Sequence, residues 1–202
     1  CKTLQQAIDM AERIGYPVVV KPEKGNQGKG VSLNITDFNG VSEAFFIANK
    51  FDRNVLVERH VPGNDYRVLV VDGRVAAVAR RIPAYIIGDG RLNILDLVKR
   101  VNQDPRRGEE HEKPLTKIKI DEISRKVLYK QGYDLSSIPM KGIKVLLKEN
   151  GNISTGGEAV DCTDRIHPEN SNIAIEAART IGLDIAGVDI SCPDISKPMS
   201  TT

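Results

Sequence analysis

The sequence is poor in the features that mark membrane, secreted or nucleic-acid-binding proteins. Its cysteines, Cys1, Cys162 and Cys192, are isolated and odd in number, and they form neither a CxxC pair nor a disulfide framework. No apolar run approaches the ~18 residues of a membrane span, and the chain does not start with a signal-peptide pattern. With 29 basic and 27 acidic residues, the net charge of +2 gives no electrostatic footprint for nucleic acid. We therefore expect a protein of the reducing cytoplasm, with neither a membrane nor nucleic acid as partner.

What is present is sufficient for a folded core. The 202 residues, of which 40% are hydrophobic and 28% charged, can form one domain or two small ones. The chain contains no internal repeat and no low-complexity segment. Cys1 opens directly into a helical pattern and the chain ends in SKPMSTT, so we expect both ends to be cuts within a longer protein.

The segment 16–31, YPVVVKPEKGNQGKGV, is the most informative in the chain. A run of β-branched residues brings Lys21 to the end of a predicted strand, and a glycine-rich loop follows at once. Glycines let backbone N–H groups approach a polyphosphate closely, and lysines add positive charge around the bend. An ordinary hairpin is an equally good interpretation of this loop alone. The loop lacks the Ser/Thr of a Walker motif, and no helical pattern follows it as a dinucleotide fingerprint requires.

Hydrophobic periodicity and turn residues predict helices and strands in mixed order. The predicted helices cover 3–14, 37–50, 94–102, 121–132 and 168–182. The predicted strands cover 18–21, 31–35, 55–58, 66–71, 75–81, 143–147, a short piece around 153, and 185–191. Asp72 and Gly73 form a tight hairpin turn between two of these strands. The charged segment 104–119, DPRRGEEHEKPLTKIK, is interpreted as a loop that is mostly solvated.

Two carboxylates near the next strand ends are candidate nucleotide ligands. Glu58 ends a predicted strand, where its carboxylate and free backbone groups could bind the amino edge of an adenine. Asp65 lies seven residues later and could accept hydrogen bonds from both ribose hydroxyls. For Glu58 taken alone, a surface salt bridge with Arg59 is the better interpretation.

Arginines and a small-residue turn form two further constellations. Arg67 lies on one strand of the predicted hairpin, opposite Arg80 and Arg81 on the other. Three guanidiniums at one sheet end could bind a carboxylate or phosphate, although strand residues in alternation could equally face solvent. The segment 154–161, STGGEAVD, is either a plain turn or a pocket whose backbone donors bind an anion or a peptide terminus.

In this order, the motifs resemble those of the ATP-grasp superfamily of carboxylate–amine ligases. The resemblance extends over nearly all of the chain and is strongest to the cyanophycin synthetases, which extend a polyaspartate chain bearing arginine on its side chains. The motifs that carry it are VVVKPEKGNQGKGV, VERHVPGNDYRVLVVDG, RIPAYIIGDG, NQDPRRG, HEKPLTKIKID, NISTGGEAVDCTD, HPEN and GLDIAGVDI. Bifunctional glutathione-making enzymes carry a similar GDG segment and are the main rival.

The resemblance implies an α+β class and an ATP-grasp fold, with mixed and antiparallel sheets, helices and an added subdomain of helices and strands. Residues 1–61 would form the small subdomain that carries the lid. Residues 62–87 and 138–202 would form the core subdomain, truncated at its C-terminal end. Residues 88–137 would be the added, family-specific subdomain, which helps to hold the polymer.

The resemblance also implies a role for each candidate residue. Lys21 would contact the α- and β-phosphates of ATP, and the loop 25–30 would close over the β- and γ-phosphates as a lid. The nucleotide-binding set would be Lys21, Gly25, Gln27, Gly28, Lys29, Gly30, Glu58, Arg59, Val61 and Asp65. Asp189 would bind Mg²⁺, and Arg80 or Arg81 would act with Lys21 at the transferred phosphoryl group. The end of the polymer would be bound by Arg67, Ser154, Thr155 and Gly156.

The implied reaction is amide formation driven by ATP and Mg²⁺. The carboxylate at the end of a cyanophycin primer would attack the γ-phosphate and become an acyl phosphate, while Mg²⁺, Lys21 and an arginine offset the repulsion between the anions. The amine of L-aspartate would then form the amide. Because no nucleophilic side chain is needed, His60, His111 and His167 are expected to be structural. The full-length enzyme is expected to be a homo-oligomer.

The sequence departs from the family pattern in places. Gln27 stands where many relatives have histidine, so a proton-transfer role for that position is in doubt. The Glu-x-Asn metal ligands and the first ATP-binding lysine of the family are not found, and we expect the chain to be inactive by itself. A glutathione-type ligase, or a nucleotide- or polymer-binding module without turnover, is the alternative function.

Overall fold

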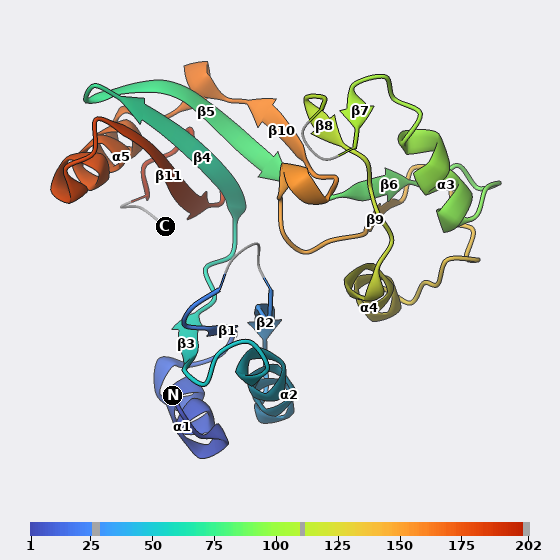
Figure 1. The fold of residues 1–202 in the computed structure, drawn as a ribbon, viewed down its shortest axis with the longest axis horizontal. Helices are drawn as coiled ribbons and strands as arrows, with labels where there is room; N and C mark the ends of the chain where they lie inside the picture. Colours follow the sequence, from blue (N-terminus) through green and yellow to red (C-terminus); the bar gives the residue numbers. More distant parts are fainter. Residues whose placement is uncertain (26–28, 110–111, 200–202) are drawn as a thin grey trace. The chain divides into compact units, whose positions relative to one another are not determined.

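The structure is a computed structural model that describes residues 1–25, 29–109 and 112–199. The chain divides into two compact units, Cys1–Val61 and Pro62–Thr202, whose elements are drawn in Figure 1. Buried hydrophobic side chains form one cluster in the first unit and separate clusters in the second, so each unit has a core of its own.

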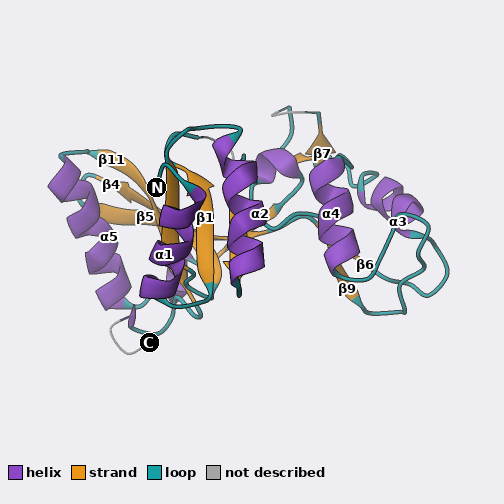
Figure 2. Ribbon diagram, turned by 90° about the horizontal axis from the view of Figure 1, so that it is seen from below, coloured by secondary structure: helices purple, strands orange, loops and turns teal. Residues whose placement is uncertain are grey.

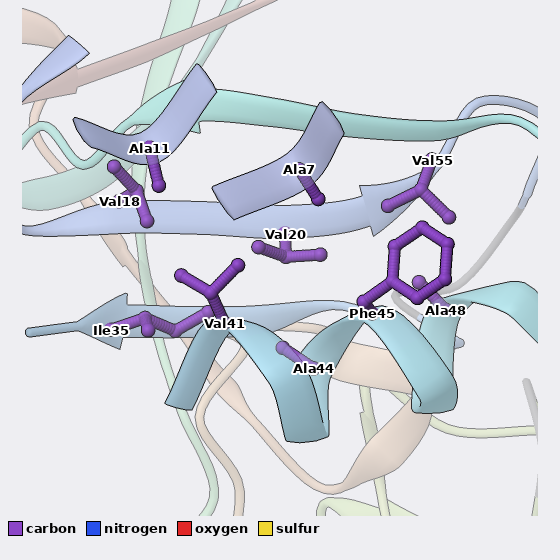
Figure 3. Close-up of a cluster of buried hydrophobic side chains, with 10 residues drawn as sticks. All are labelled: Ala7, Ala11, Val18, Val20, Ile35, Val41, Ala44, Phe45, Ala48 and Val55. Atoms are coloured by element: carbon purple, nitrogen blue, oxygen red, sulfur yellow. The ribbon is translucent and has the colours of Figure 1, made fainter. Parts of the chain in front are cut away.

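The first unit is a sheet with helices against one face. Its elements are α1 (Leu4–Ile14), β1 (Val18–Pro22), β2 (Ser32–Ile35), α2 (Phe38–Asn49) and β3 (Val55–Arg59). The strands are antiparallel in the order β2-β1-β3. Val18 and Val20 are fully buried, and Figure 3 shows them among the small side chains of α1 and α2. Both helices begin where the sequence predicts, because the side chains of Thr3 and Asp37 accept hydrogen bonds from the first turns.

The second unit contains an antiparallel sheet in the order β10-β5-β4-β11. Its elements are β4 (Asn64–Val71), β5 (Arg74–Ile82), β10 (Glu158–Asp161) and β11 (Ile185–Cys192), and α5 (Pro168–Ile181) runs along one face (Figure 2). Tyr66, Val68 and Val70 are buried on the α5 face, so the residues between them lie on the opposite face. Asp72 and Gly73 have φ of 48° and 68°, which confirms the predicted hairpin turn.

A further cluster of buried side chains lies in the same unit around two short strands. The elements are β6 (Tyr85–Ile87), α3 (Ile94–Val101), β7 (Arg107–Gly108), β8 (Leu115–Thr116), α4 (Glu122–Lys130) and β9 (Lys144–Leu146). β6 pairs with β9 antiparallel, and β7 pairs with β8 parallel. Ile86, Ile94, Leu97 and Leu128 are almost fully buried in this cluster. The two helices predicted here are confirmed, because each presents an apolar stripe to the short strands.

The structure corrects the predictions around residue 153 and in the charged segment. Ile153–Thr155 is a 3₁₀ turn (η1), not a strand, and a second 3₁₀ turn (η2) covers Thr163–Arg165. The strand β10 comes later than predicted, and most of its residues are exposed, so it has no alternating apolar pattern to reveal it. The segment 104–119 is not simply a solvated loop, because Arg107 and Thr116 are buried.

The structure also bears on the expectations for the cysteines, the histidines and membrane-spanning helices. The three cysteines are free, as expected. His167 is structural, because its Nδ1 accepts a hydrogen bond from the Glu169 N–H at the start of α5. His111 lies outside the described residues. In the described part of the chain, no helix is long and apolar enough to cross a membrane.

Asn170 on α5 anchors the segment that follows β11. Its fully buried amide donates to the carbonyls of Ile195 (2.9 Å) and Lys197 (2.8 Å) and accepts from the Met199 N–H (3.1 Å). Replacing it leaves buried backbone groups without partners, so Asn170→Ala should lower the free energy of unfolding by about 2 to 3 kcal/mol in urea denaturation. Asn172→Ala, exposed on the same helix, is the matched control and should change stability by less than about 0.5 kcal/mol. Equal effects of the two variants would contradict the anchoring role.

Candidate functional site

Lys21 and Glu58 form an ion pair on the open face of the first sheet. In the β1–β3 register, Lys21 lies opposite Leu56 and Glu58 opposite Val19, so the two charged residues are diagonal neighbours on one face. Their Nζ–Oε2 distance is 2.6 Å, and the side chains are 34% and 49% exposed. An ion pair this exposed contributes little to stability, so both groups remain available to a ligand.

The predicted salt bridge between Glu58 and Arg59 is not formed in the structure. Glu58 pairs with Lys21, whereas the Arg59 guanidinium donates to the Ile14 carbonyl at 3.1 Å. These contacts follow from strand alternation, because neighbouring residues of β3 face opposite sides of the sheet. Val61, the other predicted adenine contact, is 54% exposed.

The glycine-rich loop joins the antiparallel strands β1 and β2, so Lys21 does lie at the start of a strand–loop–strand turn. Gly30 has φ of 73°, and a Cβ there would lie 2.6 Å from the Phe51 ring. Both the backbone angle and the space therefore require glycine at position 30. Lys29 is exposed, while Gln27 and Gly28 lie outside the described residues.

In the second unit, Asp189 is held between two arginines. The register of β4 and β11 places Arg67 opposite Asp189, and the guanidinium binds both carboxylate oxygens, Nε–Oδ1 at 2.6 Å and Nη2–Oδ2 at 3.2 Å. Arg81 reaches the same carboxylate from β5, with Nη2–Oδ1 at 3.4 Å. All three side chains lie on the sheet face opposite α5. Asp65, paired with Arg81 across β4 and β5, shares that face.

Glycines make room for this charge cluster. A Cβ on Gly187 would lie 2.8 Å from Arg67 Nη1 and 3.0 Å from Arg67 Cδ, so the arginine lies directly over Gly187. A Cβ on Gly151 would lie 2.8 Å from the Cβ of Arg81. The Nε of Arg81 is buried without a hydrogen-bond partner among the described residues.

Strand alternation separates Arg80 from Arg81. Arg80 lies on the α5 face, where its Nη2 donates to the Asn64 side chain at 2.7 Å. The three predicted guanidiniums therefore do not gather at one site. Arg67 and Arg81 share the face that carries Asp189, and Arg80 is on the other.

Backbone N–H groups in the turn 153–157 are hydrogen-bonded within the turn itself. The N–H groups of Thr155, Gly156 and Gly157 donate to carbonyls of Asn152 and Ile153, and the Thr155 hydroxyl also donates to Asn152. These groups are therefore not free for a ligand. Ser154, at the exposed tip of the turn, is the residue whose hydroxyl is available.

The paired glycines of this turn serve close packing. Gly156 has φ of 94°, and a Cβ there would lie 2.7 Å from Ile118 Cγ1. A Cβ on Gly157 would lie 2.7 Å from the Ile82 carbonyl oxygen. The turn thus packs against the buried cluster around β6 and β9.

The described residues contain no group of three or more His, Cys, Asp or Glu side chains that could hold a metal ion. Asp189 can still provide one oxygen ligand, since its side chain is 53% exposed. Mg²⁺ is often bound by one or two carboxylates together with substrate phosphates and water, so a single carboxylate suits Mg²⁺ with a nucleotide better than a metal held by protein alone.

Gly187 offers a way to disturb the Arg67–Asp189 pair without touching either charge. Gly187→Ala should keep the fold, because its backbone angle suits any residue and only the flexible end of Arg67 must move. We expect the Arg67 Nε–H signal in ¹H–¹⁵N NMR spectra to shift toward its position in Asp189→Asn, and its exchange with water to accelerate. An Arg67 signal identical to that of the unsubstituted chain would contradict the close approach.

Comparison with known proteins finds sequence relatives over nearly the whole chain. Residues 2–96 match the family model described as D-ala D-ala ligase C-terminus. The chain is 48% identical over 196 residues to a cyanophycin synthetase of Trichormus variabilis, a match that covers 97% of this chain and 22% of that protein. It is 40% identical over 186 residues to a glutathione biosynthesis bifunctional protein of Streptococcus agalactiae, covering 91% of this chain and 25% of that protein.

A solved structure agrees with these matches. The crystal structure of a bifunctional glutathione synthetase from Pasteurella multocida covers 98% of this chain with a TM-score of 0.62 and 33% identity, and 27% of that protein is matched. The chain thus spans about a quarter or less of the length of each of these relatives. The chain has an ATP-grasp fold, and over nearly its whole length its sequence is homologous to a stretch of the cyanophycin synthetases.

Proposed function

We propose that the protein containing this chain is an ATP-dependent carboxylate–amine ligase that extends cyanophycin. The observation that carries the proposal is the 48% identity to a cyanophycin synthetase over nearly the whole chain, against 40% to the glutathione-making relative. The substrate carboxylate would be the C-terminal carboxylate of a multi-L-arginyl-poly-L-aspartate primer, and the amine would be that of L-aspartate. Glutathione-type ligation is the second candidate, supported by the fold match at a TM-score of 0.62.

In the first unit, we assign nucleotide binding to the open face of the sheet. Lys21 would bind the phosphates, because its ammonium lies at the start of the glycine-rich loop and its present partner, Glu58, is exchangeable. Glu58 would then be free to accept a hydrogen bond from an adenine amino group. The loop 25–30 would close over the phosphates and exclude water, which matters because an acyl phosphate hydrolyses.

In the second unit, we assign carboxylate activation to the charged face of the sheet. Arg67 would orient the terminal carboxylate of the primer, since a guanidinium binds a carboxylate with two parallel hydrogen bonds. Arg81, rather than Arg80, would offset the charge that develops on the transferred phosphoryl group, because Arg81 shares a face with Arg67 and Asp189. Asp65 would hold the ribose. Bound Mg²⁺, with Asp189 among its ligands, would supply further positive charge for the phosphoryl transfer.

A labelled-substrate assay tests the choice of substrate. The full-length protein would be incubated with ATP, Mg²⁺, a β-aspartyl-arginine primer and radiolabelled aspartate, and the label in the polymer would be counted. We expect ATP-dependent incorporation of aspartate, and no product when γ-glutamylcysteine and glycine replace primer and aspartate. Ligation of glycine to γ-glutamylcysteine, with no incorporation of aspartate, would favour the glutathione-type reaction instead.

Lys21 provides a second test through its phosphate role. Lys21→Ala in the full-length protein should lower turnover at least about a hundredfold, because a positive charge that stabilises the phosphoryl transfer is lost. Its thermal unfolding should stay close to that of the unsubstituted protein, since only an exposed ion pair is removed. Lys50→Ala, an exposed lysine after α2, is the control and should leave both properties unchanged. Near-normal turnover of Lys21→Ala would reject the assignment.

A further inference from the structure

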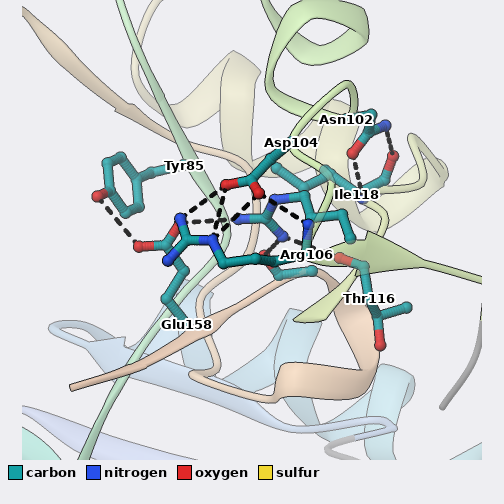
Figure 4. A network of polar contacts seen from close by, with 9 residues as sticks. Tyr85, Asn102, Asp104, Arg106, Thr116, Ile118 and Glu158 are labelled. Atoms are coloured by element: carbon teal, nitrogen blue, oxygen red, sulfur yellow. Dashed lines mark hydrogen bonds and ion pairs between the residues drawn. The ribbon is translucent and has the colours of Figure 1, made fainter. Parts of the chain in front are cut away.

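Arg107 is a buried cation at the junction of three backbone segments. Its side chain is 2% exposed, although it lies in the charged segment 104–119. Nη1 donates to the carbonyls of Thr116 (2.8 Å) and Gly156 (3.0 Å), and Nη2 donates to Glu158 Oε1 at 2.7 Å. Figure 4 shows Thr116, Glu158 and Tyr85 gathered around this network. A buried charge has to be paired and hydrogen-bonded, and these contacts provide that for Nη1 and Nη2, while Nε is buried without a partner among the described residues.

Two of the contacts of Arg107 go to the residues that follow Ser154 in the turn. Gly156 and Glu158 follow Ser154 by two and four residues, and Arg107 binds both of them. The preceding side of the turn is closed by hydrogen bonds to the Asn152 carbonyl. Ser154 is therefore the exposed tip of a segment that is fixed on both sides.

Glu158 is itself fixed by a second contact. Its Oε2 lies 3.4 Å from the Tyr85 hydroxyl on β6. Burial first, and then the negative charge of Glu158, raises the pKa of Tyr85, so the phenol stays protonated and can donate to the carboxylate. The network thus connects the turn to β6 as well as to β7 and β8.

We propose that Arg107 is a positioning residue for the polymer substrate, which acts by holding the turn 153–158 so that the Ser154 hydroxyl is presented to the primer's terminal carboxylate. The inference rests on the proposed function, in which Arg67 binds the primer end, and on the contact of Ser154 with the same end that the family resemblance implies. It gives the charged segment 104–119 a role in substrate recognition even though Arg107 touches no substrate. The planar guanidinium is required, because it reaches two carbonyls and a carboxylate at once, and a lysine ammonium cannot reproduce that fork.

The experiment compares Arg107→Lys with Arg106→Lys in the full-length protein. Arg106 is the matched control, because its side chain is 70% exposed and its hydrogen bonds go to Asp104, whose pKa they lower to about 2. For Arg107→Lys we expect the KM for the primer to rise at least about tenfold, with the KM for ATP within about twofold, since ground-state binding of one substrate is lost. Hydrogen exchange of the peptide spanning 152–158 should become faster. Arg106→Lys should match the unsubstituted protein in all these measurements.

A second variant covers the case in which Arg107→Lys does not fold. Glu158→Gln keeps the shape of the side chain and an acceptor for Arg107 but removes the charge, so it should raise the KM for the primer by about threefold and leave that for ATP unchanged. Lower thermal stability with an unchanged KM for the primer, or equal rises in both KM values, would overturn the inference. If the unsubstituted protein does not extend the primer at all, the proposed function fails. Separately, an unchanged rate of hydrogen exchange in the peptide 152–158 of Arg107→Lys would show that Arg107 does not hold the turn.

Discussion

The antiparallel pairing of β4 with β11 is the constraint on which the charged site depends. It brings Arg67 and Asp189, 122 positions apart in the sequence, directly opposite each other. The same register sends Tyr66, Val68 and Ile190 into the core beneath α5. A slip of one residue would exchange the two faces, burying the charges and exposing the apolar side chains. The hydrophobic core therefore fixes the geometry of the charge cluster, and the cluster itself need add little stability.

Much of the fold could be predicted from local sequence. The elements that the prediction missed share a physical cause. The caps at Thr3 and Asp37 and the Asp72-Gly73 turn act through neighbouring backbone, so their signals are local. β10 has no such signal, because it is mostly exposed and exists through its backbone pairing with β5. β6 is only Tyr85–Ile87, which is too short to show a period.

The candidate site was predictable in its residue types but not in its partnerships. The position of Lys21 before a glycine-rich loop is a local signal, whereas its pairing with Glu58 needs the register of β1 and β3. The charged composition around Arg107 wrongly indicated a solvated residue, because two of its hydrogen-bond partners lie 49 and 51 positions later. Strand alternation, once the hairpin register was known, was enough to distinguish Arg81 from Arg80.

The ion pair between Lys21 and Glu58 has a consequence for ligand selectivity. Without a ligand, the lysine charge is already compensated at 2.6 Å, so a simple anion such as inorganic phosphate must displace Glu58 and leave that carboxylate without its cation. A ligand that combines an anionic group with a hydrogen-bond donor compensates both side chains at once. In the nucleotide-binding role proposed for Lys21 and Glu58, the pair therefore favours ligands that carry both an anionic group and a hydrogen-bond donor over small anions.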